Sequence, residues 1–125
     1  YQHKALVLAV FRRLLMEPGL RDWPQASIAL QAYLRDTSDD LEALLVWVRE
    51  RGTPVSVRLV RGAYWDQECV LAAQQGWPLP VWRYKAETDL NYERCSDWLI
   101  AHGDWLRPMI ATHNLRSVVV AMAQA

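Results

Sequence analysis

The chain has 125 residues, of which 52% are hydrophobic, and its 14 basic and 14 acidic side chains give it no formal net charge. This length and composition predict one compact domain and argue against disorder, while the lack of a basic surplus argues against nucleic acid as a partner. No apolar run reaches the roughly 18 residues that a membrane-spanning helix needs.

The two cysteines, Cys69 and Cys95, lie in helix-like segments without the C-x-x-C spacing of redox or zinc motifs. We therefore expect reduced thiols and a cytoplasmic protein. No group of His, Asp and Glu has the spacing of metal ligands, so no metal site is expected.

Both ends of the chain interrupt helical patterns. The opening YQHKALVLAVFRRLL starts inside an amphipathic pattern, and the closing LRSVVVAMAQA stops inside another. We therefore expect residues 1–125 to be part of one domain, truncated at both ends, of a larger protein.

The apolar periodicity predicts helices that alternate with strands. A first helix ends at Pro18-Gly19, a short buried strand ends near Gln31, and a second helix ends at Gly52. The remaining predicted elements are a strand over 55–60, a helix over about 66–75, a short strand over 81–84, a helix capped by Thr88, a strand over about 107–112 and a last helix capped by Asn114.

This alternation predicts parallel strands joined by helical crossovers. Polar residues stand near the predicted strand ends at a constant separation of 27 positions, at Gln31, Arg58, Lys85 and Thr112. A regular unit of this kind favours an α/β fold that is about half of a (β/α)8 TIM-type barrel over a doubly wound sheet.

Arg58 is unusual because it interrupts the apolar alternation of its strand, VSVRLV. On a surface strand it would be a solvated charge. At the mouth of a barrel, where strand ends carry binding and catalytic residues, an unpaired guanidinium needs an anion or an electron-rich ligand. Arg61-Gly62 follows directly and allows a close approach of the backbone to a ligand.

Two further candidates have a plain and a functional interpretation. Thr112-His113-Asn114 is either an ordinary strand end and helix cap, or a donor cluster for an anionic or carbonyl-bearing ligand. Lys85 is either a surface charge or a phosphate contact. Because no nucleophile stands beside a base, the site favours a bound cofactor that carries the chemistry.

The stretches VRLVRGAYWDQE, YKAETDLNYERC and ATHN together resemble the flavin-dependent proline dehydrogenase family, in particular the proline dehydrogenase domain of the bacterial bifunctional proline utilisation A enzymes. The resemblance covers nearly the whole chain. It implies strands 3 to 6 of a distorted (β/α)8 barrel with FAD at the strand ends. It also implies oxidation of L-proline to Δ1-pyrroline-5-carboxylate, with hydride transfer to flavin N5 and electron transfer to a quinone.

The same resemblance assigns roles to residues. Arg58 would lie beside flavin N5 and O4, and Tyr64 beside the substrate, so these two are the catalytic candidates. Trp65 would contact the adenosine half. The other implied cofactor contacts are Gln31, Val60, Gly62, Ala63, Lys85, Thr112 and His113. Arg61 stands where many relatives have lysine.

Other family features lie outside this chain. The arginine pair that holds the proline carboxylate belongs to the eighth helix, so the isolated chain is expected to be inactive and to self-associate through uncovered apolar surface. The resemblance implies a cytoplasmic parent at the inner face of the membrane. Two alternatives remain: a non-catalytic α/β binding module, and another barrel enzyme with a phosphate-bearing ligand.

Overall fold

The computed structural model describes residues 3–112 and 114–124. In chain order, the elements are α1 (Lys4–Leu14), β1 (Ser27–Gln31), α2 (Thr37–Arg51), β2 (Val55–Val60), α3 (Trp65–Gln75), α4 (Lys85–Ala101), β3 (Leu106–Ile110) and α5 (Leu115–Gln124). The predicted α/β class is therefore confirmed, and every predicted helix forms. None of the described helices combines the length and the apolarity that crossing a bilayer requires.

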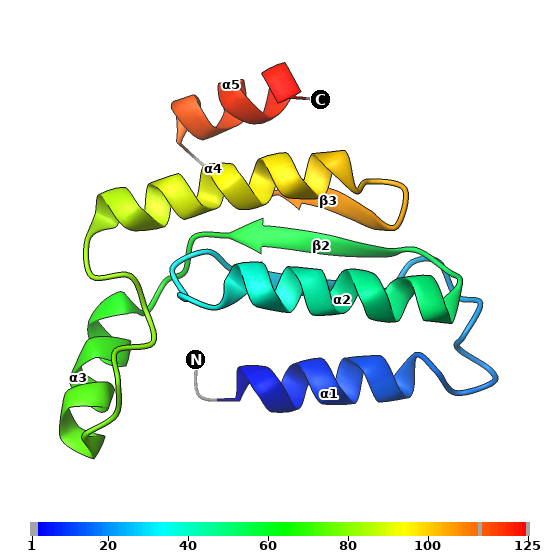
Figure 1. The fold of residues 1–125 in the computed structure, drawn as a ribbon, viewed down its shortest axis with the longest axis horizontal. Coiled ribbons are helices and arrows are strands. Elements are labelled where there is room, and N and C mark those ends of the chain that lie inside the picture. The colour runs from blue at the N-terminus through cyan, green and yellow to red at the C-terminus, as the bar shows by residue number, and fades with distance from the viewer. Residues whose placement is uncertain (1–2, 113, 125) are drawn as a thin grey trace.

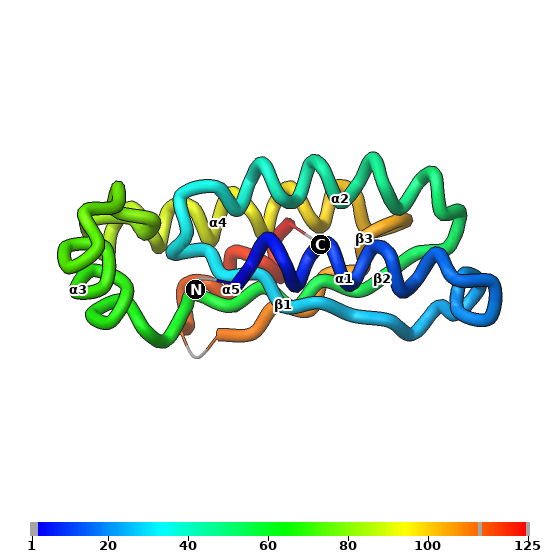
Figure 2. The backbone as a smooth tube through the Cα atoms, turned by 90° about the horizontal axis from the view of Figure 1, so that it is seen from below, coloured from blue at the N-terminus to red at the C-terminus, as the bar shows by residue number. Residues whose placement is uncertain are grey.

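The three strands form one parallel sheet in the order β1-β2-β3. Helix α2 connects β1 to β2, and α3 and α4 together connect β2 to β3 (Figure 1). Figure 2 shows α2 and α4 above the sheet, and no described helix crosses the opposite face. The molecule is therefore an open layer of helices on one side of a small sheet.

The alternation along β2 follows from this one-sided packing. Val55, Val57 and Leu59 are fully buried beneath the helices, where they join the main core. The intervening residues point to the bare face, where Arg58 is exposed. On the same face, Arg58 is in register with Ala29 of β1 and Met109 of β3.

The predicted strand over 81–84 is wrong. Val81 makes only an isolated antiparallel bridge to Leu34, and Lys85 is the first residue of α4. Pro78 and Pro80 lack the N–H groups that a sheet ladder needs, which explains why pairing stops at a single bridge. The described sheet therefore has three strands where four were expected, and the 27-residue spacing does not mark a strand end at Lys85.

The helix ends show which local sequence signals correctly predict where a helix starts or stops. Gly52 and Gly76 end α2 and α3 in left-handed conformations, with φ of 84° and 66°. Helix α4, however, starts before the predicted cap at Thr88. Glu87 accepts a hydrogen bond from the backbone N–H of Tyr84 at 3.1 Å, so it satisfies an unpaired donor at the true start.

Arg51 attaches the long α1–β1 connection to the end of α2. Its side chain is 3% exposed and donates to the carbonyl oxygens of Leu15, Leu20, Trp23 and Thr53 at 2.8–3.1 Å. Burial lowers the pKa of this guanidinium, while Asp22 opposes the shift. One side chain thus satisfies several loop carbonyls in a segment that has no regular structure.

Candidate functional site

The carboxyl ends of the strands open onto a first hollow of about 550 Å³. Parallel strands end at the same edge of the sheet, so residues far apart in sequence meet there. The hollow includes seven of the predicted site residues: Gln31, Arg58, Val60, Gly62, Ala63, Lys85 and Thr112.

The first hollow is cationic. Arg58, Arg61 and Lys85 line it, and no carboxylate is among the described residues of its lining; Asp89, which pairs with Arg61 and Lys85, stands outside that lining. Within residues 3–112 and 114–124, Arg58 makes no hydrogen bond or ion pair, and its place on the bare face keeps it exposed. Arg58 is therefore free to bind an anionic or electron-rich group, and in this structure its guanidinium is exposed to solvent.

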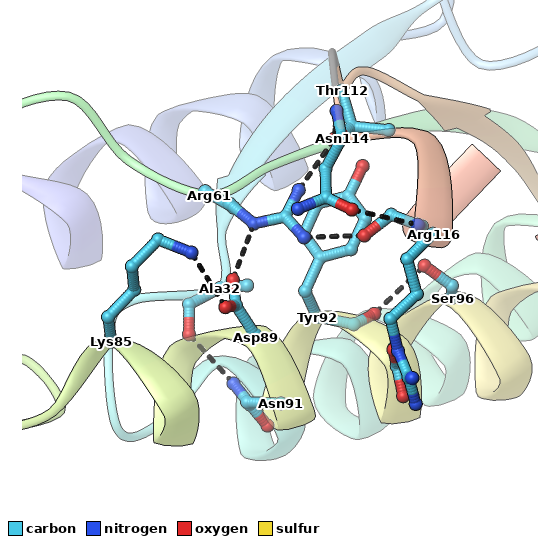
Figure 3. Close-up of polar contacts among 12 residues, drawn as sticks. Ala32, Arg61, Lys85, Asp89, Asn91, Tyr92, Ser96, Thr112, Asn114 and Arg116 are labelled. Atoms are coloured by element: carbon cyan, nitrogen blue, oxygen red, sulfur yellow. Dashed lines mark hydrogen bonds and ion pairs between the residues drawn. The ribbon is translucent and has the colours of Figure 1, made fainter. Parts of the chain in front are cut away.

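Arg61 has the opposite environment (Figure 3). Its Nε donates to Asp89 Oδ1 at 2.9 Å, one terminal nitrogen donates to Thr112 Oγ1 at 2.6 Å, and the other donates to the hydroxyl of Ser117. The guanidinium also lies over the ring of Tyr92, 4.3 Å from its centroid. Arg61 therefore connects the end of β2 to α4, to Thr112 just beyond β3, and to α5.

Asp89 is shared between two cations. Its second oxygen accepts from Lys85 Nζ at 2.8 Å, one helical turn earlier in α4. Burial alone would raise the pKa of Asp89, but the hydrogen bonds and charges of Lys85 and Arg61 outweigh it and hold this pKa below its usual value. Asp89 therefore stays ionised and holds Lys85 close to the wall of the hollow.

Tyr92 of α4 lies beneath the Arg61 guanidinium and contacts the ends of two strands. This side chain is fully buried, and its hydroxyl lies 3.1 Å from the carbonyl oxygens of both Leu59 and Ala111. Those carbonyls belong to β2 and to the residue after β3, so α4 spans the two strands at their carboxyl ends. Burial raises the pKa of Tyr92, which favours the neutral hydroxyl, whose one hydrogen is shared between the two carbonyl oxygens, while Arg61 opposes the shift.

The predicted cap of the last helix is confirmed. Asn114 Oδ1 accepts the backbone N–H of Ser117 at 3.2 Å, at the start of α5. The backbone N–H of Asn114 in turn donates to Thr112 Oγ1 at 3.0 Å. The neighbouring candidate His113 lies outside the described residues.

Gly62 allows a close contact behind the hollow. Its φ is +123°, and a Cβ at this position would lie 2.5 Å from three atoms of the Tyr33 ring. Tyr33 is 2% exposed, so it has little room to move away. Glycine is therefore required here both by the backbone conformation and by the adjacent ring.

A second hollow of about 360 Å³ adjoins the first, and the two share Arg61, Gly62 and Lys85. The predicted residue Trp65 lines this second hollow together with Tyr33 and Tyr84. The indole of Trp65 is held by a hydrogen bond from Nε1 to the carbonyl oxygen of Trp82 at 2.8 Å. The pair of hollows suits an elongated ligand with a charged part and an aromatic part.

Tyr64 is the one predicted residue of the described chain that lines neither hollow. It precedes α3 and its side chain is 60% exposed. Tyr64 therefore stands between two candidates in the chain, Ala63 and Trp65, without lining either hollow itself.

The supporting residues Asp89, Tyr92 and Ser117 were not predicted from the sequence. Lys85 and Asp89 are four residues apart, a spacing that predicts a pair on one helix face. That signal was hidden because Lys85 was placed at the end of a predicted strand, before the predicted helix start at Thr88. No sequence signal connects Arg61 with Ser117, because their contact depends on α4 and α5 packing together.

Comparison with known proteins gives a consistent result. The profile of the proline dehydrogenase family matches residues 1–125. Bifunctional protein PutA of Klebsiella aerogenes is 31% identical over 112 residues, which are 89% of this chain and 8% of that protein. The mitochondrial proline dehydrogenase 1 of Homo sapiens is 33% identical over 95 residues, 74% of this chain and 16% of that protein.

Solved structures show the same similarity. Proline utilization A from Bdellovibrio bacteriovorus, inactivated by N-propargylglycine, superposes with a TM-score of 0.98 at 45% identity, over 100% of this chain and 13% of that one. The D778Y mutant of proline utilization A from Bradyrhizobium japonicum gives a TM-score of 0.92 at 36% identity, over 96% of this chain and 12% of that one. The chain thus spans only a small part of these relatives.

Proposed function

Because the chain belongs to the proline dehydrogenase family, we propose that residues 1–125 form the central part of a domain that binds FAD and oxidises L-proline to Δ1-pyrroline-5-carboxylate. The observation that carries the proposal is the cationic first hollow, where seven predicted cofactor contacts converge. The relatives are much longer than this chain. The activity is accordingly proposed for the full-length protein, and the isolated chain is proposed to be inactive.

The donor set of the two hollows fits FAD. The cofactor combines an anionic pyrophosphate with two flat ring systems. Lys85 and the start of α5 offer donors for an anion, and Arg58 offers a free guanidinium. Trp65 in the adjoining hollow offers an aromatic surface for the adenosine half. The shared residues of the two hollows make one long site that such a molecule could span.

When bound, FAD would supply the two-electron chemistry, taking a hydride at N5. The protein's part is to bind, orient and stabilise. We assign Arg58 to the N5 and O4 side of the flavin ring, where a fixed cation favours added negative charge. Gln31 is assigned to the edge of the same ring. Val60, Gly62 and Ala63 are assigned to line the cofactor along the end of β2 and the loop that follows it. The free state of the Arg58 guanidinium supports this assignment.

The remaining assignments complete the site. Thr112, Lys85 and His113 are assigned to the ribityl and pyrophosphate region. Tyr64 is assigned to the substrate side of the flavin, where residues from other parts of the protein would surround it. Its 60% exposure beside the site leaves it available for such contacts.

We further propose that the sheet is part of a distorted (β/α)8 barrel. In such a barrel, helices cover the outer face of each strand and the inner face is closed by the remaining strands. The arrangement here, with helices on one face and Arg58 on the bare face, supports that architecture. We place the protein in the cytoplasm, with a quinone of the adjacent membrane as electron acceptor.

The spectrum of the full-length protein tests the function. Protein purified with FAD should show the flavin absorption bands, and L-proline added without oxygen should bleach them. A protein that neither takes up FAD nor responds to proline would contradict the proposal. Hydroxyproline is a necessary comparison, since a hydroxyproline dehydrogenase of Xenopus laevis is 33% identical over 98 residues.

A further inference from the structure

Three oxygen groups from different elements engage all three nitrogens of Arg61. Nε and the two terminal nitrogens donate to Asp89 in α4, to Thr112 after β3, and to Ser117 in α5 (Figure 3). The Arg61 side chain is 22% exposed and Asp89 is 31% exposed, so this corner is partly shielded from water. The planar guanidinium sets the directions of the three contacts.

Thr112 receives two hydrogen bonds at one atom. Its Oγ1 accepts from Arg61 at 2.6 Å and from the backbone N–H of Asn114 at 3.0 Å. A hydroxyl has two acceptor positions and one hydrogen. With both acceptor positions used, the Thr112 hydroxyl can engage a further group only by donating its one hydrogen, and Thr112 lines the first hollow.

Lys85 depends on the same centre through Asp89. Arg61 holds one oxygen of this carboxylate at 2.9 Å, and the other oxygen holds Lys85 Nζ at 2.8 Å. Since the side chain of Lys85 is 79% exposed, it has few other constraints on its direction. Arg61 therefore contacts the neutral Thr112 hydroxyl directly, and it influences the Lys85 ammonium indirectly, through the Asp89 carboxylate.

We propose that Arg61 is a positioning residue of the cofactor site, which orients the Thr112 hydroxyl as a donor toward bound FAD and, through Asp89, holds Lys85 at the same wall. This inference rests on the proposed function. It also makes arginine at position 61 more than a substitute for lysine, because a single ammonium cannot serve three acceptors in these fixed directions.

The test measures FAD binding to the full-length apoprotein, by titration followed through the flavin spectrum. Arg61→Met and Thr112→Val should each raise the Kd for FAD by about tenfold or more. Because they act on one contact, the double variant should bind about as the weaker single variant does. Thr112→Ser keeps the hydroxyl and should restore nearly normal affinity.

Arg116→Met is the matched control. It removes an arginine of α5 whose side chain is 77% exposed and forms an ion pair with Glu93. The affinity of the Arg116→Met variant for FAD should equal that of the unsubstituted protein. If Arg61→Met does not fold, judged by the melting of its apoprotein, Arg61→Lys and Asp89→Asn replace it, with a smaller loss of affinity expected.

Two results would overturn the inference: unchanged FAD affinity without Arg61, or effects of Arg61→Met and Thr112→Val that simply multiply. Either result would leave the proposed function intact as long as the unsubstituted protein binds FAD and is reduced by proline. A protein that binds no FAD at all would instead remove the proposed function.

Discussion

Arg58 and Arg61 stand three residues apart at one strand end, yet they have opposite surroundings. Arg58 has no partner among the described residues, whereas Arg61 contacts three elements. The difference arises because Arg58 points to the bare face of the sheet, while Arg61 follows the strand and turns toward α4. The first is suited to contact a ligand and the second to hold the site together.

Replacing Arg58 with methionine in the full-length protein tests the assigned ligand contact. Loss of the cation should lower the reduction potential of the bound flavin and slow its reduction by proline by roughly 10²-fold, with the fold preserved. Potentiometry and anaerobic stopped-flow kinetics measure these effects. Unchanged values of both would remove Arg58 from the reacting end of the cofactor.

Gly62→Ala tests the contact behind the first hollow. The new methyl group would meet the Tyr33 ring at 2.5 Å, and φ of +123° is unfavourable for alanine. We expect a loss of at least about 2 kcal/mol of stability, measured by denaturation of the full-length protein. Gly76→Ala is the control, because its φ of +66° is also positive but its Cβ would meet nothing. Equal losses in the two variants would show that the Tyr33 contact adds nothing.

At the scale of elements, polar side chains supply some of the hydrogen bonds to backbone carbonyls that helices and strands supply elsewhere. Residues 15–26 between α1 and β1 contain no helix or strand, and Arg51 binds several of their carbonyls. Tyr92 similarly joins α4 to β2 and to the end of β3. The positions of whole elements therefore depend on single hydrogen-bonding side chains.

Arg51→Met should consequently destabilise the protein by roughly 2–4 kcal/mol, because four buried or part-buried carbonyls lose their donor together. Limited proteolysis should then cleave residues 15–26 first, since this segment loses its attachment. Arg49→Met removes an exposed arginine from the same turn of α2 and should have little effect. Similar behaviour of the two variants would contradict the role given to Arg51.

At the scale of the whole molecule, much apolar surface is uncovered. In α1, Leu6, Val10 and Leu14 are 62%, 54% and 53% exposed, and Met109 on the bare face of the sheet is 48% exposed. Strands β1 and β3 also leave unpaired edges. In the proposed barrel these surfaces would be covered by the rest of the domain.

We therefore predict that the isolated 125-residue chain self-associates. Size-exclusion chromatography with light scattering should give a mass well above that of one chain, and it should rise with concentration. The double variant Leu6→Lys, Val10→Lys should lower the mass by adding charge to α1. A monodisperse monomer that melts cooperatively would contradict the prediction.

Local patterns in the sequence determined most of the fold. The apolar alternation of VSVRLV was sufficient to define β2, and Gly52 and Gly76 marked the ends of their helices, because these signals act over a few neighbouring residues. The motifs were also sufficient to predict the family. The strand expected over 81–84 was wrong: Pro78 and Pro80, which lack N–H groups, precede it, and Val81 makes only a single bridge to Leu34.

Only the tertiary structure decided how the site is held. Arg61 and Ser117 are 56 positions apart, and their contact exists because α4 and α5 pack beside the end of β2. In the same way, the exposure of Arg58 follows from which face of the sheet the helices cover. Residue types and spacing identified the groups that could bind a cofactor, but long-range packing determined which of them are free and which are fixed.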